Sequence, residues 1–269
     1  MITLILSVLA AVAVGAGLRC GLDWPWVWSI VLGVVSFFAV QIVLGMRVRK
    51  RIMEIMTTVQ GIMTDGQKRL QEKIQRWQIR PPGSMQAAQK EIADDTRVFV
   101  KEAIAATEAL DKFRLWVPMI DRQKATAQMQ LSWMIKDFKR VDELMPKVIA
   151  AEPTITAMKL ARMQMLDAPI EEIAKVYERG VRRLKYNQNV LIAACYSWIL
   201  LKRGDTDGAF KVLTEALKSS DNETLRQNHE HLMNNRPTHF SNSGIGDQWY
   251  SLFLEEPKMR TQRQRPVYR

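Results

Sequence analysis

The chain opens with ITLILSVLAAVAVGAGL (residues 2–18), and after eight further residues comes VWSIVLGVVSFFAVQIVLGM (residues 27–46). Arg19 and Asp23 are the only charged residues at positions 2–46. An α-helix rises about 1.5 Å per residue, so the run at 2–18 is near the lower limit for crossing about 30 Å of hydrocarbon, and the run at 27–46 is long enough. The sequence therefore predicts a transmembrane hairpin over residues 1–46, with spans at 2–18 and 27–46.

Residues beside the two spans predict their orientation and their lipid contacts. Trp24 and Trp26 lie in the short connection, and tryptophan is enriched at the headgroup boundary. Four cations follow the second span, namely Arg47, Arg49, Lys50 and Arg51. Such a cluster stays on the cytoplasmic side and attracts anionic headgroups by about 1 kcal/mol per charge. We expect a two-span protein of a bacterial inner membrane, with a cytoplasmic N-terminus and C-terminal domain, and with these six residues as candidate lipid-headgroup contacts.

Small residues recur at every fourth position of the first span, at Ser7, Ala11 and Gly15. Small side chains let two membrane helices approach closely, and Ser29 and Gly33 could face them from the second span. The alternative is that alanine and glycine are simply common in transmembrane helices.

Residues 47–118 carry two apolar stripes joined by a turn. Apolar residues recur at spacings of three and four from Ile52 to Trp77 and again from Met85 to Phe113, as in amphipathic helices. The sequence RPPGS at 80–84 ends the first helix, and Ser84 can cap the second. We predict a long antiparallel helical hairpin. The alternative is a parallel coiled coil, and in either case this arm could form a homo-oligomer.

Residues 119–222 show internal repetition. The stretch GDTDGAFKVLTEAL (204–217) begins with a glycine suited to an inter-helix turn and has the small residue Ala209 at a packing position. Val141 precedes Ala209 by 68 residues, which is two units of 34, and Ile173 falls between them with an offset of two. This pattern resembles tetratricopeptide (TPR) repeats, which have a period of about 34 residues. The alternative is an unrelated helical bundle.

The resemblance implies a TPR-like α-solenoid whose first helices line a concave groove for a protein partner. The candidate partner-binding residues that it implies are Gln130, Trp133, Arg162, Trp198 and Lys202. As a set they suit an acidic or extended peptide. Core packing is the alternative role for the two tryptophans, and a solvated surface position is the alternative for Arg162 and Lys202.

Residues 223–257 are expected to end the stack with a capping helix and a docked aromatic segment. Several aromatic residues lie close together here, and we expect a short helix at about 248–254 to pack on the repeats. A partner-binding motif is the alternative. Residues 258–269 carry five cations and are expected to form a disordered basic tail.

The net charge of +11 lies mostly at 47–51 and in the C-terminal tail, so it does not indicate nucleic acid as a partner. The histidines His229 and His231 are two positions apart, which splays them on a helix and disfavours a metal site. The sequence shows no nucleophile–base pairing. We therefore expect an all-α protein without enzymatic activity or cofactor, acting as a membrane-anchored protein–protein interaction scaffold or assembly factor. The alternative is a structural, oligomerising subunit of a larger membrane or envelope complex.

Overall fold

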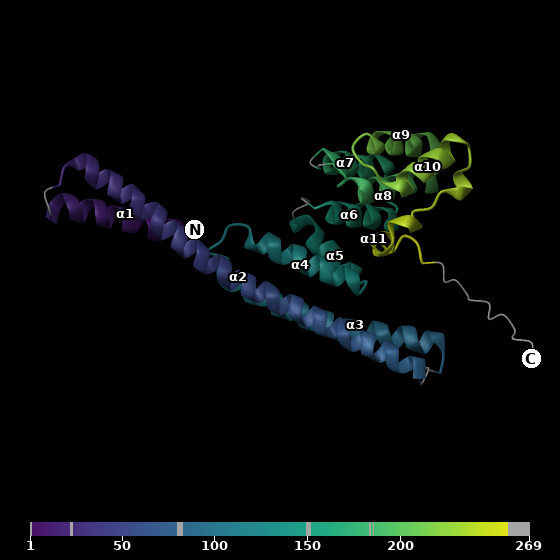
Figure 1. Cartoon of the computed structure of the whole chain (residues 1–269), viewed down its shortest axis with the longest axis horizontal. Helices are drawn as coiled ribbons and strands as arrows, with labels where there is room; N and C mark the ends of the chain where they lie inside the picture. Colours follow the sequence, from purple (N-terminus) through teal and green to yellow (C-terminus); the bar gives the residue numbers. More distant parts are fainter. Residues whose placement is uncertain are drawn as a thin grey trace, which may run out of the picture. The chain divides into compact units, whose positions relative to one another are not determined.

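The computed structural model describes residues 2–21, 24–79, 83–148, 152–182, 184 and 186–257, and all regular structure in these ranges is helical (Figure 1). The all-α prediction is thereby confirmed for the described residues. The chain forms two compact units, Met1–Ile149 and Ala150–Arg269. This boundary lies within the region 119–222 that resembles TPR repeats, so the first helix pair of that region belongs to the first unit. The turn residues 80–82 and the predicted basic tail at 258–269 lie outside the described residues.

The first unit begins with two helices that are long and apolar enough to cross a membrane, α1 (Ile2–Gly21) and α2 (Trp26–Ile79). In the most apolar stretch of 18 residues in each helix, only 11% of the residues are buried. The core helix of a soluble protein would bury most of such a stretch, whereas this chain leaves most of these side chains uncovered. Helix α2 runs for 54 residues and continues from the second apolar run into the arm without a break.

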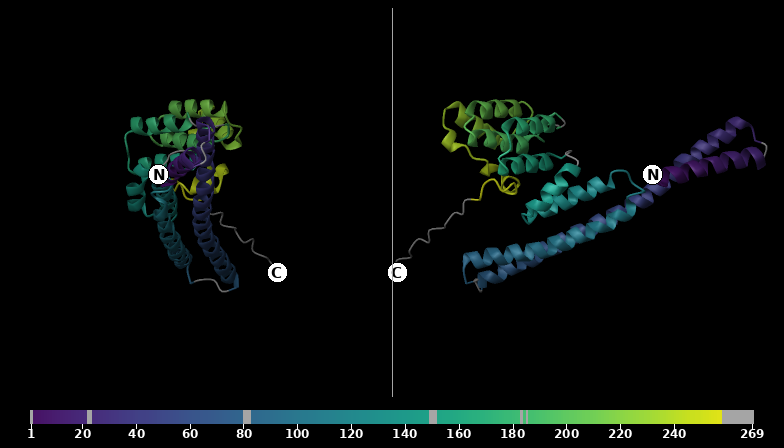
Figure 2. Two further views of the ribbon diagram at one scale, coloured as in Figure 1. Left: turned by 90° about the vertical axis from the view of Figure 1, so that its left-hand side faces the viewer. Right: turned by 180° about the vertical axis from the view of Figure 1, so that it is seen from behind.

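The arm is an antiparallel hairpin of the second half of α2 and α3 (Met85–Thr107), as Figure 2 shows. Ser84 caps α3, because its Oγ accepts a hydrogen bond of 3.1 Å from the backbone N–H of Ala87. A short 3₁₀ helix, η1 (Glu108–Phe113), follows α3. The core of the hairpin combines residues of α2, α3 and α4, namely Val59, Phe99, Val100, Ala103, Ile104 and Leu131.

Gly66 of α2 lies directly against a side chain of α3. A Cβ atom built at Gly66 would lie 2.3 Å from the ring of Phe99, so the ring of Phe99 occupies the space that any other side chain would need. The apolar stripes of α2 and α3 thus meet within one chain at this contact.

Shorter helices follow in both units. In the first unit they are α4 (Ile120–Met134) and α5 (Phe138–Leu144), followed by η2 (Met145–Lys147). In the second unit they are α6 (Pro153–Met165), α7 (Ile170–Val181), α8 (Val190–Lys202), α9 (Thr206–Leu217) and α10 (Glu223–Met233). The chain then passes through η3 (Pro237–His239) and η4 (Ser243–Ile245) to α11 (Asp247–Tyr250).

One type of turn ends α4, α6, α8 and α10. Each helix is followed by a residue with positive φ, and these residues are Lys136, Asp167, Gly204 and Asn235. In each turn the N–H of this residue donates to the carbonyl three residues earlier, and the next N–H donates to the carbonyl five residues earlier, at 2.8–3.1 Å. This pair of hydrogen bonds defines the Schellman motif. Lys136 and Gly204 are 68 residues apart, and so are Asp167 and Asn235.

Candidate functional site

Small residues form the contact between α1 and α2. A Cβ atom built at Gly33 would lie 3.1 Å from the carbonyl oxygen of Ala11, and one built at Gly15 would lie 3.4 Å from the carbonyl oxygen of Ser29. The two backbones therefore approach as closely as small side chains allow, which agrees with the packing predicted from the sequence.

A polar contact joins the same helices near their other ends. Ser7 is fully buried, and its Oγ lies 2.8 Å from Oε1 of Gln41 and 2.8 Å from the carbonyl oxygen of Thr3. An unpaired amide is costly in an apolar environment, so this contact gives Gln41 a partner inside the hairpin. Gln41 thus contributes to the packing of α2 against α1.

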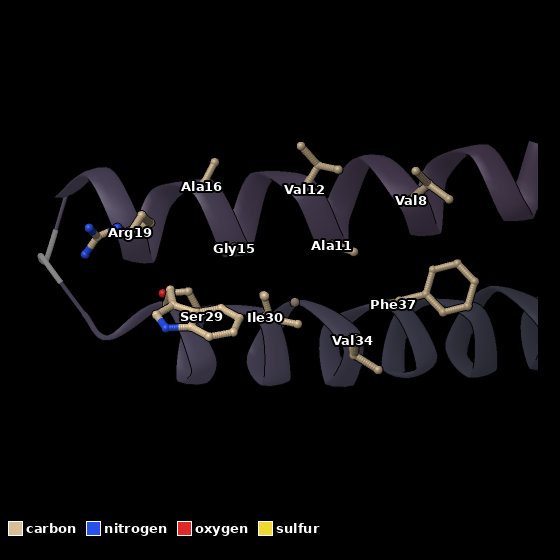
Figure 3. Close-up of a pocket in the computed structure, with 12 residues that line it drawn as sticks. Val8, Ala11, Val12, Gly15, Ala16, Arg19, Ser29, Ile30, Val34 and Phe37 are labelled. Carbon is tan, nitrogen blue, oxygen red and sulfur yellow. The ribbon is translucent and has the colours of Figure 1, made fainter.

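An apolar groove of about 590 Å³ lies along the α1–α2 contact, and Figure 3 shows its lining. Val12 and Ala16 flank it from α1, and Ile30 flanks it from α2. Arg19 lies at the loop end of the groove, where its Nη1 donates to the carbonyl of Trp24 at 3.1 Å. The groove is apolar along its length and basic at one end, so it is complementary to an acyl chain that ends in a phosphate group.

The six predicted lipid contacts all have exposed side chains. The indoles of Trp24 and Trp26 are exposed at the loop end of the hairpin. The four cations at 47–51 are exposed on α2, directly after its apolar run. Arg51 pairs with Glu54 at 3.0 Å, whereas Val48 among them is buried and faces the protein.

Helix α8 is the centre of the second unit. Every residue from Leu191 to Leu200 is buried, including Cys195. Burial raises the pKa of the Cys195 thiol, so this cysteine stays protonated and unreactive. Its Sγ lies 3.8 Å from the carbonyl oxygen of Ala157 in α6, which shows how closely α6 and α8 pack.

The C-terminal segment of the described chain lies against α8. The carboxylate of Glu255 accepts hydrogen bonds from two indole N–H groups, at 2.7 Å from Trp198 and at 2.9 Å from Trp249. The two indole rings meet edge to face at 5.9 Å, and Trp249 and Leu252 are fully buried. Hydrogen bonds to a charged acceptor are stronger than neutral ones, so Glu255 fixes this segment on α8.

A chain of buried amides holds the preceding loop. Asn242 donates to the carbonyl of Ala194 in α8 at 3.0 Å, and Asn228 of α10 donates to Oδ1 of Asn242 at 2.8 Å. The Oδ1 atom of Asn228 in turn accepts from the N–H of Ser241 at 2.9 Å. Sequence reasoning missed these residues and Glu255, because no periodic pattern or local motif marks them.

The five predicted groove residues are divided between the two units. Gln130 and Trp133 lie on α4 in the first unit, whereas Arg162, Trp198 and Lys202 lie in the second. Trp133 is only 1% exposed and packs edge to face on Phe138 at 5.4 Å. Its ring is therefore not accessible to a partner. Trp133 packs in the core instead of lining the predicted groove.

Trp198 and Lys202 are brought together. The Nζ atom of Lys202 lies 5.2 Å from the ring centre of Trp198, within the range of a cation–π interaction. Trp198 is 9% exposed because the segment around Trp249 and Glu255 covers it. Lys202 remains exposed, and Arg162 and Gln130 are half-buried.

Within the described residues, no group of three or more histidine, cysteine or acidic side chains could hold a metal ion. No protein-family model matches the chain, and neither a curated protein nor a solved structure matches it. Its function therefore has to be inferred from its own residues and contacts.

Proposed function

We propose that the protein is a membrane-anchored scaffold or assembly factor that binds a protein partner through TPR-like helix pairs on the cytoplasmic side of the membrane. The repeated helix-ending turn is the observation that carries this proposal. The same two hydrogen bonds follow α4, α6, α8 and α10; consecutive turns are 31, 37 and 31 residues apart, and alternate turns are therefore separated by 68 residues. A recurring helix–turn–helix unit of about 34 residues is the hallmark of TPR arrays.

Packing after each turn supports the same assignment. Val141, Ile173 and Ala209 occupy corresponding places in α5, α7 and α9, and each is completely buried. Asp137 and Asp205 cap α5 and α9 by accepting from backbone N–H groups at 3.3 and 2.8 Å. α7 follows Pro169 and has no such cap, but the second helix of each pair has a buried residue at the same place, as expected of units that stack to complete a core.

The α8 face suggests the chemistry of the partner. Trp198 already binds a carboxylate through its indole N–H, and the cation of Lys202 lies over the same ring. A partner segment with an acidic side chain beside an aromatic one would have to displace Glu255 and Trp249 from Trp198 to make the same contacts. The partner proposed here is the acidic or extended peptide that is expected from the sequence.

The anchor places this binding unit at the membrane. Helix α2 joins the second apolar run to the arm as one helix, so the arm cannot rotate freely about a linker. The cations at 47–51 favour a cytoplasmic location for everything that follows them. A scaffold of this kind would hold its partner near the bilayer surface.

Charge reversal at Arg162 of α6 and Lys202 of α8 tests the proposal. The full chain is purified from its membranes in mild detergent after crosslinking, as wild type and as R162E/K202E. The matched control is R179E/K211E, which reverses two exposed cations on α7 and α9. An acidic partner should be recovered at least about ten-fold less with R162E/K202E, since two attractive charges become repulsive. Equal recovery with both double variants would refute binding at this face. A stoichiometric complex of the chain with itself alone would favour the structural-subunit alternative.

A further inference from the structure

The loop between η1 and α4 has an unusual composition and exposure. Residues 113–119 read FRLWVPM, whereas loops in water are mostly polar. The side chain of Leu115 is 64% exposed and that of Met119 is 57% exposed. Met119 also has a φ of 69°, a conformation that residues other than glycine rarely adopt. The fold therefore holds apolar side chains outward at this loop.

Contacts within the first unit fix the position of the loop along the membrane hairpin. The carbonyl of Leu115 accepts a hydrogen bond of 3.0 Å from the N–H of Ile2, the first residue of α1. Ser7 lies beside Gln41 in the antiparallel pair, so Ile2 lies near the level of Met46, the end of the second apolar run. Leu115 thus sits where the apolar helices end.

A cavity of about 410 Å³ lies between the loop and the hairpin. Trp116, Val117 and Pro118 line it from the loop, and Thr3 and Gln41 line it from the spans. The loop therefore packs against both helices at the boundary between their apolar parts and the charged arm.

The cations around the loop are complementary to an anionic surface. The exposed cations at 47–51 follow directly on α2. On the loop side Arg114 pairs with Asp121 at 3.1 Å, and Arg122 adds an exposed cation. Apolar side chains ringed by cations are typical of segments that enter the headgroup region without crossing the bilayer.

We propose that residues 113–119 are a third membrane contact, which inserts Leu115 and Met119 into the headgroup–acyl boundary of an anionic phospholipid bilayer. This inference rests on the membrane anchor in the proposed function, and it does not depend on the protein partner. The hairpin and the loop would together hold the arm in one orientation, because two spans and one lateral contact prevent rotation about the hairpin axis.

Three leucines of similar exposure allow a matched test. Leu9 on α1 is 60% exposed, Leu115 is 64% exposed and Leu166 in the second unit is 59% exposed. Each is replaced by cysteine in a full-length Cys20→Ser background, since Cys195 is fully buried and does not label. The thiols are labelled with an environment-sensitive fluorophore, and the protein is reconstituted in vesicles of phosphatidylcholine and phosphatidylglycerol.

Nitroxide groups on the lipid acyl chains then report contact with the membrane. We expect quenching and a blue-shifted emission at positions 9 and 115, and neither at position 166. If position 9 is quenched and position 115 is not quenched, as expected for position 166, the inference is overturned and the anchor remains intact. Absence of quenching at position 9 would instead overturn the anchor, and the inference with it. Equal quenching at 115 and 166 would also overturn it, because the loop would then have no contact of its own.

Discussion

Replacing Gly66 by alanine tests the packing of the arm, and Gly61 on the same helix provides a matched control. In a helix interior, glycine-to-alanine substitution stabilises by about 1 kcal/mol when the new methyl group meets nothing. A Cβ atom at Gly61 has no neighbour within 4 Å, so G61A should increase the free energy of unfolding by about that amount.

At Gly66 the same methyl group would meet three ring carbons of Phe99, the nearest at 2.3 Å. Overpacking of a core costs about 1–3 kcal/mol, which exceeds the gain in helix propensity. We therefore expect G66A to be less stable than wild type by about 1 kcal/mol. The smaller side chain in F99L should relieve part of this loss, with a coupling energy of at least about 0.5 kcal/mol in a double-mutant cycle.

The assay is urea unfolding of the full chain in mild detergent, followed by circular dichroism of the helices. The reasoning requires opposite signs for G61A and G66A. Equal stabilisation by both substitutions, or a G66A/F99L variant whose effect is the sum of the single ones, would refute the close contact between Gly66 and Phe99.

Three further predictions concern the second unit and the membrane hairpin. Glu255→Gln removes the charged acceptor from two indole hydrogen bonds of 2.7 and 2.9 Å, so limited proteolysis should cut within 247–257 several times faster than in wild type. Unchanged cleavage would show that Glu255 does not hold this segment on α8. Burial is the largest cause that raises the pKa of Tyr177 to about 12, so the folded state keeps a proton that the unfolded state releases above its ordinary pKa of 10.0. Stability should therefore fall by about 2 kcal/mol as the pH rises from 10 to 12, and Y177F should lack this component in unfolding curves taken across that range. Ser7→Ala leaves the amide of Gln41 without its partner across the hairpin and should destabilise the α1–α2 contact by about 0.6 kcal/mol in a detergent unfolding assay, whereas S7A/Q41L should be near neutral because both polar groups are gone.

Local patterns in the sequence predict much of the fold. The apolar runs 2–18 and 27–46, the stripes of the arm and the cap at Ser84 each depend on neighbours within a few residues, and the structure has helices and a cap at these places. Small residues at every fourth position likewise predict the approach of α1 and α2, because the spacing alone puts them on one face.

Contacts between distant residues could not be predicted in this way. Trp198 and Glu255 are separated by 57 residues, and nothing in either neighbourhood indicates that they meet. A glycine within a helix predicts only lower helix stability, and the role of Gly66 appears once Phe99 is known to pack on it. Trp133 has the sequence spacing of a groove residue, but the turn into α5 brings Phe138 over its ring and makes it core.

Labelling with a membrane-impermeant maleimide in intact cells tests the membrane anchor and its orientation most directly. The native Cys20 is exposed near the connection between α1 and α2, and Cys195 is buried, so the wild-type chain carries a single accessible thiol. Our account predicts that Cys20 reacts from outside the cell. A cysteine at the exposed Lys90 of the arm, in a Cys20→Ser background, should react only after the membrane is permeabilised. Labelling of the arm in unbroken cells, with Cys20 protected, would contradict the account.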